Sequence, residues 1–464
     1  NSLITELGKS TSQDPWGFFD KYSFTKEDIK TLFEFFELTF LSENARPLWI
    51  DSHLAEPCYS LYPYQRTVSN KINNLLKTSG NRVLLHMPTG SGKTRTAMNF
   101  VCRHLIDNEK TVVIWFANTS ELLEQAYDEF LKAWGFLGNR SMQAFKLWGE
   151  SNIDLKNITD GFVVAGMSKA YSRLMDDIGS FSAFASQCTL VVMDEAHQAI
   201  APTYQLIIDQ LLRPMSSAQL LGLSATPGRT WNDPDADRKL SEFFATRKVT
   251  LKVDGYDNPV SYLINQGYLA EPKFTQIEIA ANLALTSEEQ DRIRETFELP
   301  SSVLDRLGDN DQRNLLIVHH AEQLLKRHSR VILFAASVRQ SDLLAAVLSA
   351  RGHWAASITS KSPNGRAESI AAFKDDEDRP KILCNFGVLT TGFDAPRTSA
   401  ALIARPTLSL VLYSQMVGRA MRGKVAGGNE TCEILTVVDT TLPGFDSVVD
   451  AFSNWEDVWS DKDD

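Results

Sequence analysis

The chain has 464 residues, of which 43% are hydrophobic and 23% are charged, and its formal net charge is −11 at pH 7. This length exceeds what one hydrophobic core usually serves, so two or three domains are expected. The acidic balance argues against tight, nonspecific binding of naked duplex DNA by a basic surface. It does not argue against a protein that binds a nucleic-acid strand through main-chain and hydroxyl contacts.

No apolar run of about eighteen residues occurs, so no membrane partner is expected. The chain begins without a basic segment followed by an apolar stretch, so no signal peptide is expected either. Its five cysteines are scattered and form no close pair, which argues against a disulfide framework or a metal knuckle. This cysteine usage favours a reducing compartment, and a cytoplasmic location is therefore expected.

Four stretches follow one another along the chain. Residues 1–57 are expected to be a helical accessory region, with an aromatic amphipathic helix over Glu27–Leu41. We expect this region to pack as a cap on the next domain, and a docking surface for a partner is the alternative. Residues 254–308 have mixed character and are expected to connect the two remaining stretches.

Residues 58–253 and 309–464 both alternate short apolar segments with helical patterns. This alternation is typical of α/β lobes, each with a parallel sheet covered by helices on both faces. In the first lobe, strands are expected at Arg82–His86, Thr111–Phe116, Phe162–Ala165, Leu190–Met193 and Leu220–Leu223. In the second lobe, they are expected at Val331–Phe334, Lys381–Cys384, Ala401–Ala404 and Ile434–Val438. The spacing of apolar residues from Phe445 to Trp459 predicts a C-terminal helix.

A phosphate-binding loop follows the first predicted strand, at residues 87–94, and leads into a helix. Gly90 and Gly92 allow main-chain N–H groups to point at phosphates, and the helix N-terminus favours an anion. Lys93 is expected to reach the β- and γ-phosphates, and Thr94 to ligate Mg²⁺. Met87 stands where the usual pattern has glycine. The residues expected to bind the nucleotide in this loop are Thr89, Gly90, Ser91, Gly92, Lys93 and Thr94.

Two acids follow the buried strand Leu190–Met193, at the strand end where ligands bind in such sheets. Asp194 is expected to hold Mg²⁺, and Glu195 to orient and deprotonate the attacking water. His197 has no second His or Cys nearby in sequence, so we interpret it as a coupling residue that faces the cleft between lobes. Ser224 and Thr226 follow the next strand and are expected to relay the state of the acids.

In this order the motifs resemble those of superfamily 2 helicases and translocases, with two RecA-like lobes. The resemblance covers about residues 58–440. It implies that Gln65 bonds the adenine edge and that a nearby aromatic, Tyr64, stacks on the base. It also identifies three segments as contacts to a nucleic-acid strand, and these are Phe116–Ser120 together with Glu124 and Gln125, Gly166–Ser168 and Leu333–Ser337.

Two second-lobe motifs carry the resemblance further. Residues 385–396 include Gly392 and Asp394, which the resemblance places near the nucleotide. Residues 413–422 carry two arginines three positions apart, on one helix face. By resemblance Arg419 and Arg422 reach the γ-phosphate as arginine fingers, and Gln415 contacts the nucleotide or its water.

The amino-acid sequences of these second-lobe motifs resemble those of a DNA-directed group, which contains RadD-type, UvrB-like, XPB-like and type I restriction motors. The resemblance therefore implies an ATP- and Mg²⁺-dependent helicase or translocase on DNA, in repair or in antiviral defence. The alternatives are an RNA helicase, a motor subunit whose protein partners supply specificity or a nuclease, and a non-hydrolysing nucleotide-gated clamp. The side chains expected to bond strand phosphates are those of Thr119, Ser168, Ser337 and Thr390.

Overall fold

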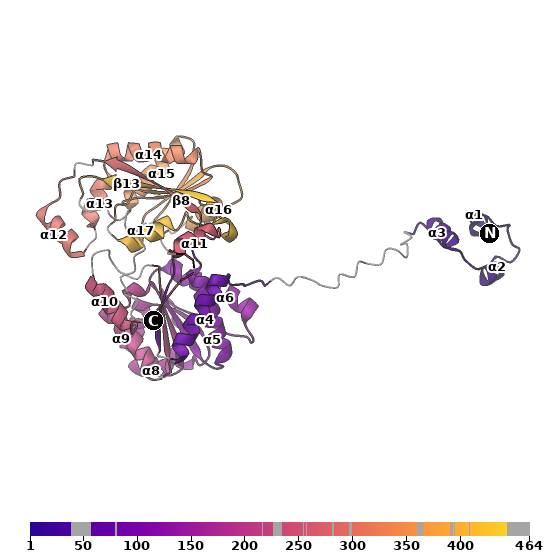
Figure 1. Ribbon diagram of the computed structural model, residues 1–464, viewed down its shortest axis with the longest axis horizontal. Helices are drawn as coiled ribbons and strands as arrows, with labels where there is room; N and C mark the ends of the chain where they lie inside the picture. The colour runs from indigo at the N-terminus through magenta and orange to yellow at the C-terminus, as the bar shows by residue number, and fades with distance from the viewer. Residues whose placement is uncertain are drawn as a thin grey trace. The chain divides into compact units, whose positions relative to one another are not determined.

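The computed structural model describes residues 1–38, 57–78, 81–215, 217–225, 234–253, 255–256, 258–280, 283–296, 299–359, 365–389, 393, 395–407 and 409–442. The chain divides into two compact units, residues 1–58 and 59–464. The first unit contains three short helices, which are α1 (Ser2–Glu6), α2 (Pro15–Lys21) and α3 (Lys26–Phe35) (Figure 1). A capping box between Thr25 and Asp28 starts α3. The predicted helix is thus present over Lys26–Phe35, while residues 39–41 lie outside the described part. Its role as a cap on the next domain stays a prediction.

The first lobe is built on a seven-stranded parallel sheet with the order β3-β4-β2-β5-β6-β1-β7. Its strands are β1 (Arg82–His86), β2 (Val112–Ala117), β3 (Ala144–Leu147), β4 (Gly161–Gly166), β5 (Cys188–Asp194), β6 (Gln219–Ser224) and β7 (Lys248–Thr250). Its helices are α4 (Pro63–Thr78), α5 (Lys93–Asp107), α6 (Ser120–Leu137), α7 (Met167–Asp176), α8 (Ile178–Ala185), α9 (Pro202–Leu212) and α10 (Pro234–Phe243). In Figure 1, α4, α5 and α6 lie on one side of this sheet and α9 and α10 on the other.

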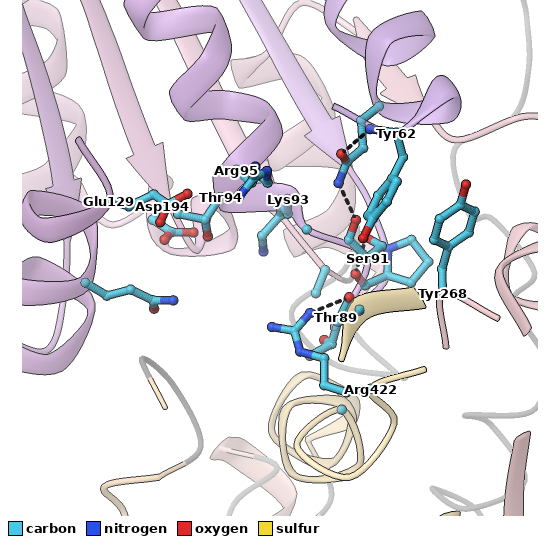
Figure 2. A pocket seen from close by; sticks show the side chains of 18 of the residues that line it. Tyr62, Thr89, Ser91, Lys93, Thr94, Arg95, Glu129, Asp194, Tyr268 and Arg422 are labelled. Atoms are coloured by element: carbon cyan, nitrogen blue, oxygen red, sulfur yellow. Dashed lines mark hydrogen bonds between the residues drawn. The ribbon is translucent and has the colours of Figure 1, made fainter. Parts of the chain in front are cut away.

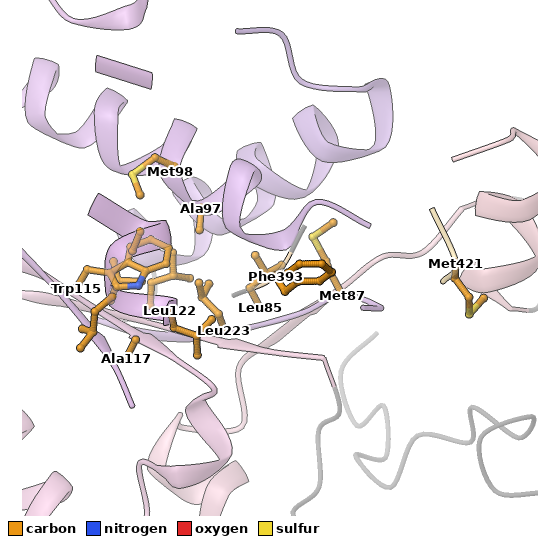
Figure 3. Close-up of a cluster of buried hydrophobic side chains, with 14 of the residues drawn as sticks. Leu85, Met87, Ala97, Met98, Trp115, Ala117, Leu122, Leu223, Phe393 and Met421 are labelled. Carbon is orange, nitrogen blue, oxygen red and sulfur yellow. The ribbon is translucent and has the colours of Figure 1, made fainter. Parts of the chain in front are cut away.

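Side-chain alternation along the strands explains this layering. In β1, Val83 and Leu85 belong to the cluster under α4, α5 and α6, whereas Leu84 belongs to the cluster on the opposite face. Figure 3 shows the first of these clusters, with Met98 of α5 near Trp115 of β2. The strands are apolar on both faces because helices cover both faces of the sheet.

The second lobe is built on a six-stranded parallel sheet with the order β10-β11-β9-β12-β13-β8. Its strands are β8 (Glu271–Ile279), β9 (Arg330–Phe334), β10 (Trp354–Ile358), β11 (Lys381–Asn385), β12 (Ala400–Ile403) and β13 (Thr431–Asp439). The helices are α11 (Pro259–Asn265), α12 (Ser287–Thr296), α13 (Ser301–Gly308), α14 (Asp311–Leu325), α15 (Val338–Ala350), α16 (Arg366–Lys374) and α17 (Leu410–Val417). The two predicted α/β lobes with parallel sheets are therefore confirmed.

The structure corrects one expectation. Residues 254–308 are more than a connector, because β8 pairs with β13 along its whole length and forms an edge of the second sheet. The strand is difficult to predict because Glu271–Ile279 alternates polar and apolar residues and is buried only at Ile279. Every strand expected from the sequence is present, and β3, β7 and β10 are additional short strands. The predicted C-terminal helix lies outside the described residues.

Within the described parts of the chain, no helix is both long and apolar enough to cross a bilayer. All five cysteines are free thiols, and only Cys58 is exposed. Because every paired strand is parallel, the loops that follow β1, β5 and β6 come together at one edge of the first sheet. The phosphate-binding loop, the two acids and Ser224 therefore meet there, as their positions at strand ends predict.

Candidate active site between the two lobes

A cavity of about 410 Å³ lies where the loop after β1 faces the end of α17, and both lobes line it (Figure 2). The first lobe contributes the loop from Pro88 to Thr94 and the acids Asp194 and Glu195. The second lobe contributes Gln415, Gly418, Arg419 and Arg422. The predicted phosphate loop, acids and second-lobe residues thus meet in one cavity.

The phosphate-binding loop depends on two glycines in the left-handed region. Gly90 has a φ of 86° and Gly92 a φ of 81°, a conformation that L side chains rarely adopt. A Cβ atom on Gly92 would also lie 2.3 Å from Nε2 of Gln65. Gly92 is the N-cap of α5, so the helix begins at Lys93 and directs its N-terminal N–H groups toward the cavity.

Gln65 and Tyr64 hold this loop from behind. Nε2 of Gln65 and the hydroxyl of Tyr64 both donate to the carbonyl oxygen of Ser91, at 3.0 and 2.7 Å. The Gln65 side-chain oxygen accepts the N–H of Tyr62 at 2.9 Å. Both side chains are buried, so in this arrangement they fix the shape of the loop. Contact of Gln65 and Tyr64 with the base stays a prediction.

Two other tyrosines are the more accessible aromatic residues of the cavity. Tyr62 and Tyr268 are only partly buried and both line it, and their ring centroids are 4.5 Å apart. Tyr268 belongs to the segment between the lobes, and the Tyr62 hydroxyl donates to the carbonyl of Val425 in the second lobe at 3.0 Å. The sequence analysis assigned neither residue a role, although Tyr62 is two positions before Tyr64.

Asp194 and Glu195 are both buried. Burial raises the pKa of Asp194 to about 6, against the lowering effect of the nearby Lys93 ammonium. Glu195 adopts a left-handed backbone with a φ of 51°, which is a strained conformation for a residue with a side chain. Its N–H donates to Oδ1 of Asp194 at 3.0 Å. Such strain is typical of functional sites, where the surrounding structure imposes it.

The carboxylate of Glu195 is surrounded by groups from both lobes. Lys93 Nζ lies 3.9 Å from Oε1, and His197 Nδ1 lies 3.5 Å from Oε2. Gln415 of the second lobe donates from Nε2 to Oε1 at 3.1 Å. Burial alone would raise the pKa of Glu195, but Lys93, His197 and the Gln415 hydrogen bond lower it below its ordinary value. Glu195 is therefore held ionised, as a base must be.

The two predicted arginine fingers do not share a helix face as expected, because α17 ends at Val417 and both arginines follow it. They reach different groups. Arg422 donates to the carbonyl oxygen of Gly90 at 2.6 Å, and Figure 2 shows it extending from the second lobe toward the phosphate loop. Arg419 donates to the carbonyl oxygen of Phe393, and its charge also lowers the pKa of Glu195. Gly418, the residue before Arg419, faces Thr89 so closely that a Cβ atom would lie 2.2 Å from Cγ2 of that residue. The sequence analysis assigned no role to Gly418.

The donor set fits a magnesium ion bound together with phosphates. Asp194 is a buried carboxylate whose pKa is raised by burial, so a bound cation would stabilise its ionised form, and Thr94 lines the same cavity. Among the described residues, no group of three or more His, Cys, Asp or Glu side chains could hold a metal by itself. Mg²⁺ commonly takes one or two protein oxygens and completes its shell with water and phosphate oxygens, so this sparse set is appropriate.

The structure also places the remaining predicted residues. Ser224 is buried at the end of β6, and its carbonyl accepts the N–H of Met87 at 3.1 Å, so it joins the phosphate loop to the sheet. The Thr119 hydroxyl caps α6, whereas Ser168 is exposed in the first turn of α7. Ser337 is buried and caps α15, so a phosphate contact by its hydroxyl would require it to leave the cap. Thr226, Thr390, Gly392 and Asp394 lie outside the described residues.

One further contact connects two motifs of the first lobe. The Asn118 side chain, next to the capping Thr119, donates to the side-chain oxygen of Gln198. Gln198 follows the acids by three positions, so the expected strand-contact segment is joined directly to the segment that carries Glu195 and His197. The sequence analysis placed Asn118 within a strand-contact motif but did not predict this partner.

Two regions of the chain match known protein families. Residues 58–229 match the family described as "Type III restriction enzyme, res subunit", and residues 314–424 match the "Helicase conserved C-terminal domain". Both regions fall in the unit that contains the cavity. The two matched families correspond to the two lobes.

Individual relatives agree with these families. The chain is 24% identical over 402 residues to "Putative ATP-dependent helicase IRC3" of Saccharomyces cerevisiae, covering 83% of this chain and 53% of that protein. It is 23% identical over 378 residues to "Type I restriction enzyme EcoAI endonuclease subunit" of Escherichia coli, covering 77% and 44%. The chain thus spans about half the length of these relatives.

Solved structures show the same fold. A fragment of a putative HsdR subunit of a type I restriction enzyme from Vibrio vulnificus aligns with a TM-score of 0.57 and 17% identity, covering 93% of this chain and 72% of that one. Dbp5 of S. cerevisiae, bound to RNA and ADP BeF3, aligns with a TM-score of 0.54 and 16% identity, covering 85% and 91%. Family matches, motif order and fold together identify the chain as a member of the superfamily 2 helicase and restriction-motor group.

Proposed function

We propose that the chain is an ATP-driven motor that moves along DNA as a helicase or translocase. The observation that carries this proposal is the hydrogen bond between Gln415 of the second lobe and Glu195 of the first. A group expected to position the attacking water is thereby held by the opposite lobe, so the site is complete only when the lobes close. Opening and closing of the lobes in step with hydrolysis would shift a strand bound across both of them.

Each group of the site has a role in this scheme. Glu195 would orient the water and accept its proton, since its pKa is lowered and its carboxylate is ionised. Lys93 and the N–H groups of the phosphate loop would bind the phosphate oxygens. Thr94 and Asp194 would hold Mg²⁺, which supplies positive charge to the phosphates. Arg419 and Arg422 would neutralise charge that develops on the γ-phosphate, in a cavity that closure shields from water.

DNA is proposed as the track on the basis of the relatives. One matching family is named for a restriction enzyme subunit, and the EcoAI relative is an endonuclease subunit. Such names favour a DNA-directed motor that works beside protein partners supplying specificity or a nuclease. The RNA-bound Dbp5 shares only the fold, so an RNA track is the second candidate.

ATP hydrolysis measured with no polymer, single-stranded DNA, duplex DNA and RNA of matched length tests the proposal. Stimulation by either form of DNA, and not by RNA, is expected. Stimulation by RNA alone would contradict the DNA assignment. An equally low rate in all four would contradict a motor that acts alone and would support the partner-dependent subunit. Lys93→Ala, which removes the phosphate-binding ammonium, provides the background rate in every case.

A further inference from the structure

A cluster of aromatic rings around one lysine lies outside the nucleotide cavity. It consists of Glu124 and Tyr127 on α6, Lys146 on β3 and Trp148 just after β3, and we call it the aromatic–lysine cluster. Lys146 Nζ lies 4.5 Å from the Tyr127 ring centroid and 5.1 Å from that of Trp148. The two rings meet edge to face with centroids 6.3 Å apart. Lys146 Nζ also lies 2.9 Å from Oε2 of Glu124.

The position of Trp148 is fixed from three sides. The Cβ atom that Gly166 lacks would lie 3.4 Å from Cβ of Trp148, so the end of β4 allows the tryptophan to pack closely against it. Lys169 of α7 donates from Nζ to the carbonyl oxygen of Gly149, the next residue, at 3.2 Å. With Tyr127 and Lys146 on its other sides, the indole is held in place yet stays partly exposed. A partly exposed, immobilised ring loses little entropy when a flat ligand stacks on it.

The cluster lies in line with the residues expected to contact a strand. Strands β3, β4 and β2 are neighbours in the sheet, and all three are parallel. Trp148 follows β3, Ser168 follows β4 and Thr119 follows β2, so the three residues occupy one edge of the sheet. Adjacent strands are about 4.8 Å apart, so the row spans about 10 Å. A strand that contacts Thr119 and Ser168 and continues along this edge would next meet Trp148.

The chemistry of the cluster selects the ligand. Every nucleobase has a flat π face that stacks on an aromatic ring, and unpaired bases expose this face whereas duplex bases do not. The one cation of the cluster, Lys146, is paired with the carboxylate of Glu124, so the cluster attracts phosphate only weakly. Stacking is therefore the main interaction that the cluster can make with a ligand. Packing of Trp148 and Tyr127 against the core is the simpler explanation, but it does not account for the position of the cluster at the end of this row.

We propose that Trp148, held by Tyr127 and Lys146, is a stacking platform for one base of a single-stranded nucleic acid bound along this edge of the first lobe. This inference rests on the proposed function and adds to it a specific base contact and a preference for unpaired strands. It assigns Trp148 to strand binding and gives it no part in ATP hydrolysis.

Two variants of the full chain test the proposal, with binding measured on single-stranded DNA, single-stranded RNA and duplex DNA. Trp148→Leu should weaken single-strand binding by about tenfold or more, which is the effect of losing one stacked base, whereas Trp148→Phe should keep most of the affinity. Phe136→Leu is the matched control, because Phe136 is an exposed aromatic at the opposite end of α6. Equal losses on DNA and RNA would show a base contact shared by both, and a loss on one alone would identify the track.

Two readouts separate stacking from a phosphate contact or a folding defect. The slope of log affinity against log salt concentration should be the same in Trp148→Leu and wild type, because a stacked base releases no counterions. A set of oligonucleotides, each with one abasic site at a different position, provides the second readout. Wild type should bind more weakly when the abasic site occupies one particular position, whereas the affinity of Trp148→Leu should not depend on that position. ATP hydrolysis without polymer should be unchanged in Trp148→Leu, which shows that the lobe is folded.

The outcomes that contradict the inference are distinct from those that contradict the function. If wild type binds single strands and Trp148→Leu binds them with the same affinity, the stacking platform alone would be overturned. A smaller salt slope in Trp148→Leu would also overturn the platform, because it would indicate a lost phosphate contact. Wild-type protein that binds none of the three polymers would overturn the proposed function together with the platform.

Discussion

Gln415 in α17 of the second lobe donates a hydrogen bond of 3.1 Å to Glu195, which follows β5 in the first lobe. Glu195 already lies in a strained left-handed conformation. A strained residue keeps a single position only when its surroundings hold it there, and here one of the holding groups comes from the other lobe. The geometry of the proposed base thus depends on closure of the two lobes.

Glu195→Gln should bind ATP normally and hydrolyse it hardly at all. The amide keeps the shape of the side chain but cannot accept a proton from water. Rapid-mixing measurements of bound and cleaved ATP check this. Lys93→Ala is the contrasting variant, because it should lose binding as well as turnover. Substantial turnover by Glu195→Gln would remove Glu195 from the role of base.

Gln415→Ala should lower the maximal rate of ATP hydrolysis by about 10- to 100-fold, the cost of losing one hydrogen bond to a charged group. ATP affinity in the absence of polymer should change little, because most groups expected to contact the phosphates belong to the first lobe. Gln415→Glu should be worse, since a second carboxylate about 3 Å from Glu195 would raise its pKa. Equal rates for Gln415→Ala and wild type would show that the cross-lobe hydrogen bond is dispensable.

Arg422→Ala should lower turnover by about 10³-fold or more, as the loss of an arginine finger does, while ATP binding is retained. The measurement is steady-state hydrolysis together with the affinity for a fluorescent ATP analogue. Arg327→Ala is the control, because Arg327 is a half-exposed arginine of the same lobe that pairs with Glu433, and neither residue lines the cavity. A similar loss in both variants would indicate a general effect on the second lobe.

Gly418→Ala should slow hydrolysis by keeping the lobes apart. Its added Cβ atom would lie 2.2 Å from Cγ2 of Thr89, a distance that real contacts do not reach, so the phosphate loop and α17 would have to separate. Gly135→Ala in the last turn of α6 is the control, because nothing lies within 4 Å of its Cβ position. That control should gain at most about 1 kcal/mol of unfolding free energy from helix propensity. Undiminished turnover by Gly418→Ala would show that this close approach is unimportant.

The raised pKa of Asp194 predicts a specific pH dependence. Its pKa of about 6 lies above the ordinary value of 3.8. Between these values the folded protein binds more protons than the unfolded protein, so without metal the unfolding free energy falls as pH rises. Mg²⁺ binds only the ionised carboxylate, so the affinity for Mg²⁺-ADP should fall about tenfold per pH unit below pH 6. Calorimetric titrations of wild type and Asp194→Asn measure this, and the same slope in both would contradict it.

The ATP-binding half of the site was accessible from the sequence, because it consists of residues at strand ends. Lys93, Asp194 and Glu195 each follow or nearly follow a buried apolar run, and parallel sheets bring such positions together. The same logic placed both sheets correctly. It failed for β8, whose alternation of polar and apolar residues resembles a loop but which pairs with β13 along its whole length.

The remaining parts of the site depend on contacts that no local pattern encodes. Tyr62 and Tyr268 are distant in sequence and meet only because the segment between the lobes returns to the start of α4. Gln65 has the expected position, but its side-chain amide donates to Ser91 of the phosphate loop and accepts from the N–H of Tyr62. Ser337 fits a strand-contact motif, yet its hydroxyl serves as a helix cap. Gln65 and Ser337 are placed as expected, but their hydrogen-bond partners are set by tertiary packing.

Displacement of streptavidin from biotinylated DNA tests the central claim of ATP-driven movement most directly. Single-stranded and duplex substrates would carry the block at one end or the other, with Glu195→Gln as the hydrolysis-deficient control. The account predicts ATP-dependent displacement by wild type from at least one DNA substrate and none by Glu195→Gln. DNA-stimulated ATP hydrolysis without displacement from any of the substrates would contradict it, because energy would then be released without motion along the strand.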